Sequence, residues 1–319
     1  MTPYDTGFIA AGDGHRLYYE RCGNRSGIPV LFLHGGPGSG IVDSHKRAFD
    51  FKKFNVLFFD QRGAGRSTPF ATVKANTTPH LVADINLLLN HFGLKRVVVF
   101  GGSWGSTLGL VYAIRHPERV LGLILRGIFL ADSASMKHYL GGGVATYAPA
   151  EWERFISQVP PRSRNNLIEY YYRKMTRGPT RERKRFAFEW AVFELSLLAL
   201  ETSLQDVEQR LRSYSFESLS ILKCHYLRSG CFIPRNFILR NAEKIARIPT
   251  SIVHGRYDLI CPPEQAYRLH KKLPASRLLI VNAGHAATEP EILSALRSEL
   301  ALLEKRLRGK FRSSKQTRS

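Results

Sequence analysis

Short apolar runs alternate with longer segments of helical period along most of the chain. The runs are rich in β-branched and aromatic residues and lack the polar alternation of a strand that faces water on one side. They occupy residues 29–33, 55–59, 97–100, 120–125, 251–253 and 278–281. Strands that are apolar on both faces suit a parallel sheet covered by helices on either side. The pattern therefore predicts a doubly wound α/β fold.

A further pair of strand-like segments precedes these runs near the start of the chain. Residues 8–11 and 15–21 flank Gly12-Asp13-Gly14, whose composition is typical of a hairpin turn. Because such a hairpin joins neighbouring strands that run in opposite directions, we expect it to add antiparallel strands at one edge of the sheet.

The strand rhythm stops after about residue 130 and resumes at Ile248. The intervening chain instead shows helical patterns, at residues 151–159, 165–175 and 183–200. An interruption of this kind indicates a helical domain inserted into the α/β core. We therefore expect a core made of residues 1–130 and 247–303, a helical cap at 131–246, and a disordered basic tail at 304–319.

Composition is that of an ordinary globular protein, with 319 residues of which 44% are hydrophobic. The N-terminus lacks a basic segment followed by an apolar one, and no run approaches the roughly 20 apolar residues of a membrane span. The four cysteines are scattered without a C-x-x-C pair, which favours a reducing compartment over disulfides or zinc. We expect a cytoplasmic protein with no membrane span and no metal.

Charge is the unusual feature, because 47 Lys and Arg against 26 Asp and Glu give a net charge of +21. Much of the excess lies at residues 162–185 and in the tail. Such a balance suits nucleic acid or another anionic partner, and it equally suits a solvated face with a frayed terminus. No nucleic-acid-binding motif accompanies it, so we expect no nucleic-acid partner. The sequence leaves the oligomeric state open.

The stretch Gly101-Gly102-Ser103-Trp104-Gly105 follows the apolar run at 97–100 and precedes a helical segment at 106–116. A G-x-S-x-G between a strand and a helix places its serine on a sharp turn, where flanking side chains would collide with neighbouring elements. The motif alone is weak, since a serine in a glycine-rich turn has the same appearance. Ser103 is a candidate nucleophile if its partners are present.

Partners for a nucleophilic serine follow other predicted strands. Asp258 comes after the strand at 251–253 and His285 after the strand at 278–281, in the order that serine hydrolases of this topology use. We expect His285 to take the proton of Ser103 while Asp258 orients the imidazole. The backbone N–H groups of Gly36, in His34-Gly35-Gly36-Pro37-Gly38, and of Trp104 are the candidate oxyanion hole.

These motifs together carry a resemblance to a known family. They read HGGPG at 34–38, DQRGAGRS at 60–67, NTTPHLVADI at 76–85, GGSWGSTL at 101–108, RGIF at 126–129, GRYDLICPP at 255–263 and AGH at 283–285. As a set they are similar to the prolyl aminopeptidase (proline iminopeptidase) family of α/β-hydrolase serine peptidases, up to about residue 300. The resemblance implies an α/β-hydrolase fold with a mostly parallel sheet and an inserted helical cap. It also implies release of N-terminal proline from short peptides through an acyl-enzyme, without a metal or organic cofactor.

The resemblance also implies substrate-binding residues. Glu194 matches the cap glutamate that receives the ammonium group of the substrate, and Phe129, Tyr139 and Cys261 match positions that line the proline pocket. Aromatic and cysteine side chains at these places are equally compatible with packing in the cap core.

Three positions depart from the family: Phe193 stands in place of a tryptophan, Leu227 in place of an aromatic residue, and Lys223 in place of a carboxylate. Lys223, in Lys223-Cys224-His225-Tyr226-Leu227, stands where a second ammonium-binding glutamate is expected. If it points into the pocket it repels a substrate ammonium, since two charges 4 Å apart interact by ~4 kcal/mol at an effective dielectric near 20. If it pairs with Glu194, the pocket is near neutral and suits a different small amide or ester. The third reading is a one-residue slip in the alignment or a lysine turned to solvent. Glu289, four residues after His285, is a candidate compensating carboxylate.

The sequence thus supports a prolyl aminopeptidase-like serine hydrolase acting on a small peptide or amide. A serine hydrolase of the same architecture acting on another small amide or ester is the alternative. A binding protein on an inactive hydrolase scaffold is a third hypothesis, against which the intact set Ser103, Asp258 and His285 argues.

Overall fold

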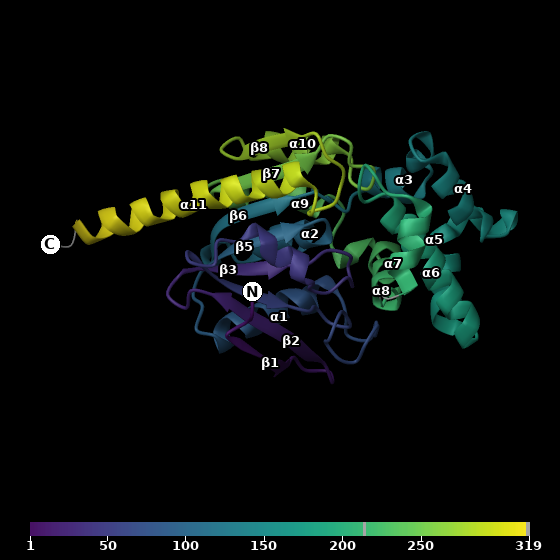
Figure 1. Cartoon of the computed structure of the whole chain (residues 1–319), viewed down its shortest axis with the longest axis horizontal. Helices are drawn as coiled ribbons and strands as arrows, with labels where there is room; N and C mark the ends of the chain where they lie inside the picture. The colour runs from purple at the N-terminus through teal and green to yellow at the C-terminus, as the bar shows by residue number, and fades with distance from the viewer. Residues whose placement is uncertain (213–214, 317–319) are drawn as a thin grey trace.

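A computed structural model describes residues 1–212 and 215–316, with side chains described as far as Gly309. Its centre is an eight-stranded sheet in the order β1-β2-β4-β3-β5-β6-β7-β8 (Figure 1). The strands are β1 (Asp5–Ala10), β2 (Arg16–Gly23), β3 (Ile28–Leu33), β4 (Phe54–Phe59), β5 (Val97–Gly102), β6 (Val120–Arg126), β7 (Thr250–Gly255) and β8 (Arg277–Val281). The strands from β3 to β8 are parallel, and β1 and β2 are antiparallel at one edge. The six predicted strands and the hairpin are confirmed.

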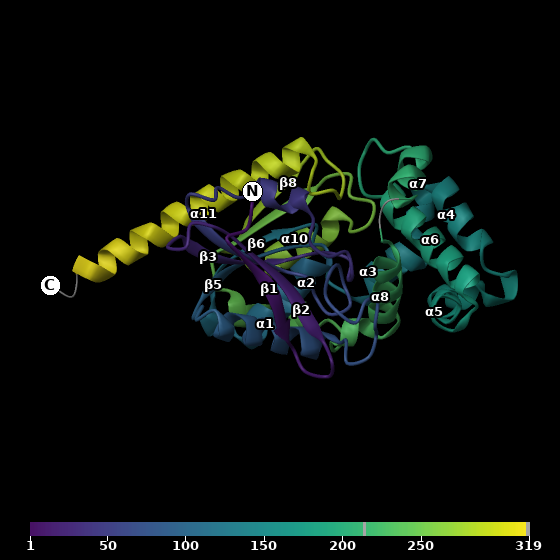
Figure 2. The ribbon, with the colours of Figure 1, turned by 60° about the horizontal axis from the view of Figure 1, so that its bottom comes forward.

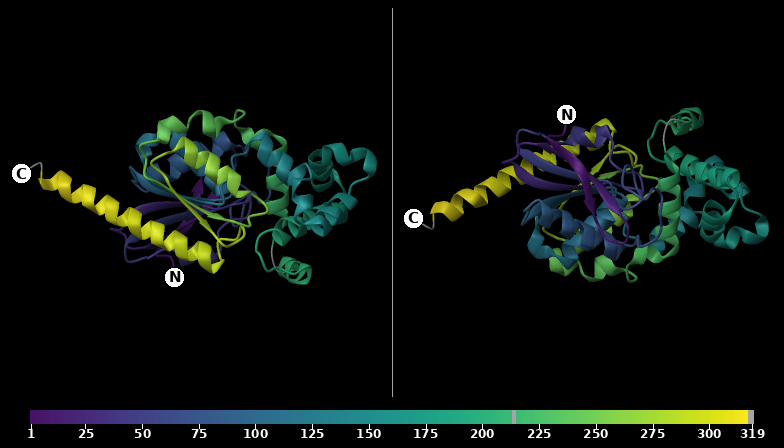
Figure 3. Two further views of the ribbon diagram at one scale, coloured as in Figure 1. Left: turned by 90° about the horizontal axis from the view of Figure 1, so that it is seen from above. Right: turned by 90° about the horizontal axis from the view of Figure 1, so that it is seen from below.

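The sheet has an apolar core on each face, because its central strands are buried on both sides. One core includes α1 (Thr78–His91), α2 (Trp104–Arg115) and α10 (Pro263–Lys272), which pack against residues such as Leu31. The opposite core lies under α11 (Pro290–Gln316) and contains a cluster of phenylalanines. In Figure 3, α11 lies on one side of the sheet, and α1, α2 and α10 lie on the opposite side. The architecture is the predicted helix–sheet–helix arrangement.

Helix α11 differs from the disordered tail expected at residues 304–319. It continues to Gln316 and projects beyond the sheet (Figures 1 and 2). Leu303 and Leu307 are buried and extend the apolar stripe of Leu296 and Leu300. The helix therefore still buries an apolar face at the start of the segment 304–319, although the high charge of that segment suggested disorder. Residues 317–319 of that tail lie outside the described part of the chain. No described helix is both long and apolar enough to cross a membrane.

Helices α3 to α8 follow β6 and lie at the carboxyl ends of the parallel strands, where they form the cap (Figures 1 and 2). They are α3 (Ser133–Leu140), α4 (Pro149–Ser157), α5 (Leu167–Arg177), α6 (Thr180–Ser196), α7 (Leu204–Arg212) and α8 (Glu217–Arg228). Stacked aromatic rings hold them together: the ring centre of Phe155 lies 4.5 Å from that of Tyr171 and 4.3 Å from that of Phe193. The short helix α9 (Phe237–Arg240) then packs on α2 of the core. The sequence predicts the end of the cap a few residues later, at 246.

The DQRG motif at residues 60–63 holds a loop of the core that contacts helix α8 of the cap. The buried Arg62 donates from Nε and Nη2 to the two carboxylate oxygens of Asp84, at 2.7 and 2.8 Å. The carbonyl oxygen of Arg62 accepts a hydrogen bond from the side chain of Asn76. In turn, Asn76 Oδ1 accepts from the hydroxyl of Tyr226 in α8, and its backbone oxygen is 2.9 Å from His225 Nε2. This loop therefore positions α8 over the carboxyl ends of the strands.

Candidate active site

Ser103 lies on a strained turn between β5 and α2. Its φ of 57° and ψ of −125° are rare for a residue with a side chain. A Cβ on Gly101 would lie 2.2 Å from the carbonyl oxygen of Gly105, and a Cβ on Gly105 would lie 2.1 Å from that of Leu33. Only glycine fits at both positions, because strand and helix approach each other this closely. The sequence thus forces the serine to the tip of the turn, where it is 8% exposed.

His285 and Asp258 form a buried pair on the loops that follow β8 and β7. His285 Nδ1 lies 2.6 Å from Asp258 Oδ2, while Asp258 Oδ1 accepts the backbone N–H groups of Ile260 and Cys261 at 3.0 and 2.8 Å. Burial on its own raises the pKa of Asp258, but the facing His285 and these hydrogen bonds outweigh it and lower the pKa below its usual value. The carboxylate therefore stays ionised and fixes the proton of His285 on Nδ1, which leaves Nε2 as the accepting nitrogen.

Two further histidines near the site, His254 and His34, have structural contacts. His254 Nδ1 accepts the backbone N–H of Ile128, and its Nε2 lies 2.7 Å from the carbonyl oxygen of Cys261. His34 Nε2 accepts the backbone N–H of Gln61 at 3.0 Å. Burial lowers the pKa of both imidazoles, so both remain neutral. Their ring nitrogens are occupied in holding loops.

The loop that carries His285 is attached to the cap as well as to the core. The backbone N–H groups of His285 and Ala286 both donate to the carbonyl oxygen of Leu198, just after α6, at 2.8 Å. Glu289 bridges the two parts: Oε2 accepts the N–H of Gly284 at 2.7 Å and Oε1 accepts the N–H of Leu200 at 3.2 Å. Glu289 therefore binds backbone amides, in contrast to the compensating role in the pocket that the sequence suggested.

Arg126 secures the same loop from the core side. It lies at the end of β6 and donates from Nη1 to the carbonyl oxygen of His285, while its own carbonyl oxygen accepts the N–H of Ser103 at 2.9 Å. Sequence reasoning assigned no role to Arg126, although a charged residue at the end of an apolar strand in the RGIF motif was an available signal. Nothing in the sequence indicates that Leu198 holds the His285 loop, because the contact is made by its backbone carbonyl oxygen.

The candidate oxyanion donors lie at the same end of the sheet. Trp104 is the first residue of α2, so its N–H is among the first helical amides, which have no acceptor inside the helix. Gly36 has a φ of 108°, and a Cβ there would lie 2.6 Å from the nitrogen of Gly38. The loop is held by its neighbours: Trp104 Nε1 donates to Gln61 Oε1 at 2.9 Å, and Gln61 Nε2 donates to the carbonyl oxygen of His34.

A cavity of about 460 Å³, which we call the Ser103 cavity, connects these groups. Ser103, His285 and Gly36 line it from the core, and Glu194 lines it from the cap. His45 also lines it, and burial lowers the pKa of this imidazole to about 3, so it carries no charge. The volume is within the range of small-ligand sites.

The expected recognition residues divide into two groups. Glu194, Lys223 and Tyr139 meet in a buried cluster: Lys223 Nζ donates to Glu194 Oε1, and the hydroxyl of Tyr139 donates to Glu194 Oε2. Of these three only Glu194 is in the lining of the Ser103 cavity. Phe129 and Cys261 pack into the apolar core beside α2 and α10, also outside that lining. Burial raises the pKa of the Cys261 thiol well above its ordinary value, so it is a neutral packing group.

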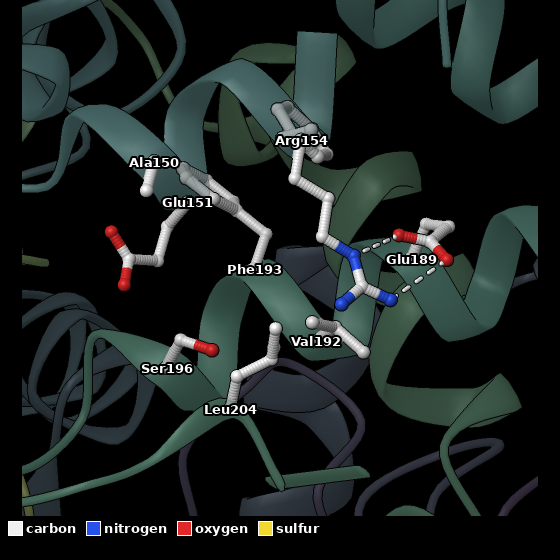
Figure 4. A pocket seen from close by; sticks show the side chains of 9 residues that line it. Ala150, Glu151, Arg154, Glu189, Val192, Phe193, Ser196 and Leu204 are labelled. Atoms are coloured by element: carbon white, nitrogen blue, oxygen red, sulfur yellow. Dashed lines mark hydrogen bonds and ion pairs between the residues drawn. The ribbon is translucent and has the colours of Figure 1, made fainter. Parts of the chain in front are cut away.

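A second, smaller cavity of about 110 Å³ lies within the cap between α4 and α6. Figure 4 shows its mainly apolar lining, with Phe193 and Leu204 beside the ion pair of Arg154 with Glu189. It contains no member of the Ser103, Asp258 and His285 set. No group of three or more His, Cys, Asp or Glu side chains in the described part of the chain is arranged to hold a metal ion.

Comparisons with known proteins define the class first. Residues 28–291 match the model of the alpha/beta hydrolase fold family. Among solved structures, a proline iminopeptidase of Mycobacterium smegmatis has a TM-score of 0.60 at 18% identity and covers 95% of this chain and 100% of its own. An esterase of Exiguobacterium antarcticum has a TM-score of 0.62 at 20% identity, with coverage of 95% and 100%. At these identities the structures establish the fold alone.

Relatives found by sequence are more similar to this chain than these solved structures are, and they identify its family. A probable proline iminopeptidase of Leptolyngbya boryana is 43% identical over 301 residues, which are 93% of this chain and 93% of the relative. A proline iminopeptidase of Arabidopsis thaliana is 40% identical over 299 residues, which are 93% of this chain and 79% of the relative. The chain therefore belongs to the proline iminopeptidase family of α/β-hydrolase-fold enzymes.

Proposed function

We propose that this enzyme is a serine hydrolase that releases N-terminal proline from short peptides, with Ser103 as nucleophile, His285 as general base and Asp258 as the acid that orients it. The observation that carries the proposal is a strained serine sharing one cavity with a histidine whose Nδ1 is held by a buried carboxylate. Relatives at about 40% identity that are named proline iminopeptidases support the choice of substrate.

The chemistry follows from these positions. As the Oγ of Ser103 attacks the scissile carbonyl carbon, its proton passes to His285 Nε2 and the carbonyl oxygen gains negative charge. The N–H groups of Gly36 and Trp104 stabilise that oxygen. His285 then gives the proton to the departing amine, which leaves the prolyl group as an ester on Ser103. Water, deprotonated by the same histidine, hydrolyses the ester and restores the serine.

The surroundings of the site support a small substrate and an intracellular setting. The Ser103 cavity lies between core and cap and suits a short peptide better than a folded protein. All four cysteines are free and buried, which favours a reducing compartment, and we include a cytoplasmic location in the proposal on that ground.

The test is hydrolysis of proline β-naphthylamide together with labelling by a fluorophosphonate. Ser103→Ala is expected to abolish labelling and to lower kcat by at least about 10⁴-fold, since the nucleophile is the group that reacts. Ser157→Ala, in an exposed serine at the end of α4 that is outside the lining of the cavity, is the matched control and should retain both. Labelling that persists in Ser103→Ala would overturn the assignment. A wild-type protein that is folded but never labels would favour a binding protein on an inactive scaffold.

A further inference from the structure

The charged groups around the Ser103 cavity are predominantly cationic. Among the described residues that line it, Arg126 and Arg210 are cations and Glu194 is the sole carboxylate. A substrate with an ammonium group needs a carboxylate that can receive it, because a charge leaves water only where a partner replaces its hydration. The state of Glu194 therefore decides which substrates the cavity accepts.

Both oxygens of Glu194 are already engaged from inside the protein. Lys223 of α8 donates to Oε1 and Tyr139 of α3 donates to Oε2. The Lys223 ammonium also lies 4.5 Å from the centre of the Tyr139 ring. Glu194 and Lys223 are each 5% exposed, so the pair is closed off from water. Burial, and then the charge of Glu194, raise the pKa of Tyr139 well above its ordinary value, so its hydroxyl remains a neutral donor.

A substrate ammonium placed at Glu194 would meet a second cation. Around Glu194 of α6 lie Lys223 of α8, the neutral hydroxyl of Tyr139 of α3 and the neutral thiol of Cys261 after β7. Arg126 of β6 lines the same cavity, but its guanidinium donates to the His285 loop and interacts with the carboxylate of Asp258. The charge of Glu194 is already balanced by Lys223, so an ammonium group at this point would face a like charge. Like charges in such a partly desolvated place repel more strongly than in water.

We propose that Lys223 is a specificity-determining residue that occupies the position of a substrate ammonium on Glu194, so that the enzyme selects prolyl amides whose ring nitrogen is uncharged. The inference rests on the proposed function, since it concerns the substrate of the same site. An uncharged prolyl nitrogen has two sources. One is the free base of an N-terminal proline, and the other is a proline acylated on nitrogen.

The first experiment uses the wild-type enzyme and two β-naphthylamides of the same shape. One carries proline, and the other carries cyclopentanecarbonyl, which has no ionisable nitrogen. Both are measured between about pH 6 and about pH 9, on either side of the ~8 pKa of an α-amine. The ratio of their kcat/KM values cancels the pH dependence of the enzyme itself. We expect the prolyl to cyclopentanecarbonyl ratio to rise about 100-fold over this range, as the free-base fraction does.

The N-acetylprolyl β-naphthylamide distinguishes the two sources. If its kcat/KM exceeds that of free proline amide even at about pH 9, where the amine is a free base, acylated proline is the preferred substrate. If it is lower there, the free base is preferred. A ratio of prolyl to cyclopentanecarbonyl substrate that does not change with pH, or that is highest at low pH, would overturn the inference.

Variants test Lys223 itself. Lys223→Met removes the internal cation and frees Glu194 to receive a substrate ammonium. At about pH 6, we expect the ratio of kcat/KM for the prolyl substrate to that for the cyclopentanecarbonyl substrate to rise at least about tenfold. This rise corresponds to about 1.4 kcal/mol. The matched control is Lys223→Met combined with Glu194→Gln, which removes both charges and should show no such gain. Thermal melting and fluorophosphonate labelling show that each variant is folded and has a reactive serine.

The failures of the two proposals are distinguishable. An enzyme that labels with fluorophosphonate but hydrolyses none of the three amides overturns the proposed function, and this inference with it. An enzyme that hydrolyses proline amide with a pH-independent ratio retains the proposed function and overturns only the role of Lys223. A gain in the double variant equal to that of Lys223→Met also overturns it, because Glu194 would then not be the receiving group.

Discussion

The two sides of the Ser103 cavity are built in different ways. On the core side, Ser103, Asp258 and His285 follow β5, β7 and β8, and backbone geometry and amide hydrogen bonds set their positions. On the cap side, Glu194 and Lys223 come from two separate helices, and the packing of aromatic rings around them sets their positions.

This difference separates reaction from recognition. A strained turn between a strand and a helix cannot change without loss of the glycines that permit it, so the core side is rigidly specified. A helix surface accepts a new side chain wherever the neighbours satisfy it, and Lys223 is satisfied by Glu194. By pairing with Glu194, one lysine therefore changes the charge balance beside the cavity, while Ser103, Asp258 and His285 keep their arrangement.

The largest expected effect is on the free energy of unfolding, when an ion pair of the core and an ion pair of the cap are each broken by one substitution. Arg62 and Asp84 are 3% and 1% exposed, so Arg62→Met leaves a buried carboxylate unpaired and should lower the free energy of unfolding by about 3–5 kcal/mol. Arg228 and Glu169 form a pair that is about a third to a half exposed, and Arg228→Met should cost at most about 1 kcal/mol. Urea unfolding of both variants measures the difference. Equal losses would mean that the core pair is not the stronger constraint.

The same contrast explains what the sequence predicted. The strands, and the places of Ser103, Asp258 and His285 after β5, β7 and β8, were predictable because each lies in a contiguous motif of its own. The attachment of the His285 loop to Leu198 was not, since a backbone carbonyl has no sequence signature. Helix α11 was misread at its end because its charges obscured an apolar stripe that includes Leu307. The pairing of Lys223 with Glu194 remained one of three readings, because it depends on how α6 and α8 pack.

A second prediction concerns Glu289, which connects the His285 loop on the core side to the backbone of the cap. Glu289→Gln keeps one carbonyl oxygen and cannot accept both amides, so either the N–H of Gly284 or that of Leu200 loses its acceptor. The histidine loop should then be less well positioned, and we expect about a tenfold lower kcat with little change in KM, because Glu289 is not in the lining of the cavity. Steady-state kinetics on proline β-naphthylamide measures both parameters.

The control for Glu289→Gln is Glu291→Gln, in an exposed glutamate two residues further along the chain, at the start of α11. It makes the same change of charge and should leave kcat as it is in the wild type. The rate constant for fluorophosphonate labelling should fall with kcat in Glu289→Gln, since both reactions need His285 in place. A rise in KM with unchanged kcat would instead assign Glu289 to substrate binding.

The smallest expected effect tests how rigidly the core side is specified. Ser103 has a φ of 57°, which a residue with a Cβ adopts at a cost of about 1–3 kcal/mol and glycine adopts without that cost. Glycine also makes the unfolded chain more flexible, which offsets about 0.5–1 kcal/mol of the gain. Ser103→Gly should therefore be more stable to urea than Ser103→Ala by about 1 kcal/mol, the difference between these two terms. Both variants lack the hydroxyl and differ only in the Cβ, so the comparison isolates the backbone. A glycine variant that is less stable than the alanine variant would mean that the turn is not strained and that packing of the Cβ sets the position of the serine.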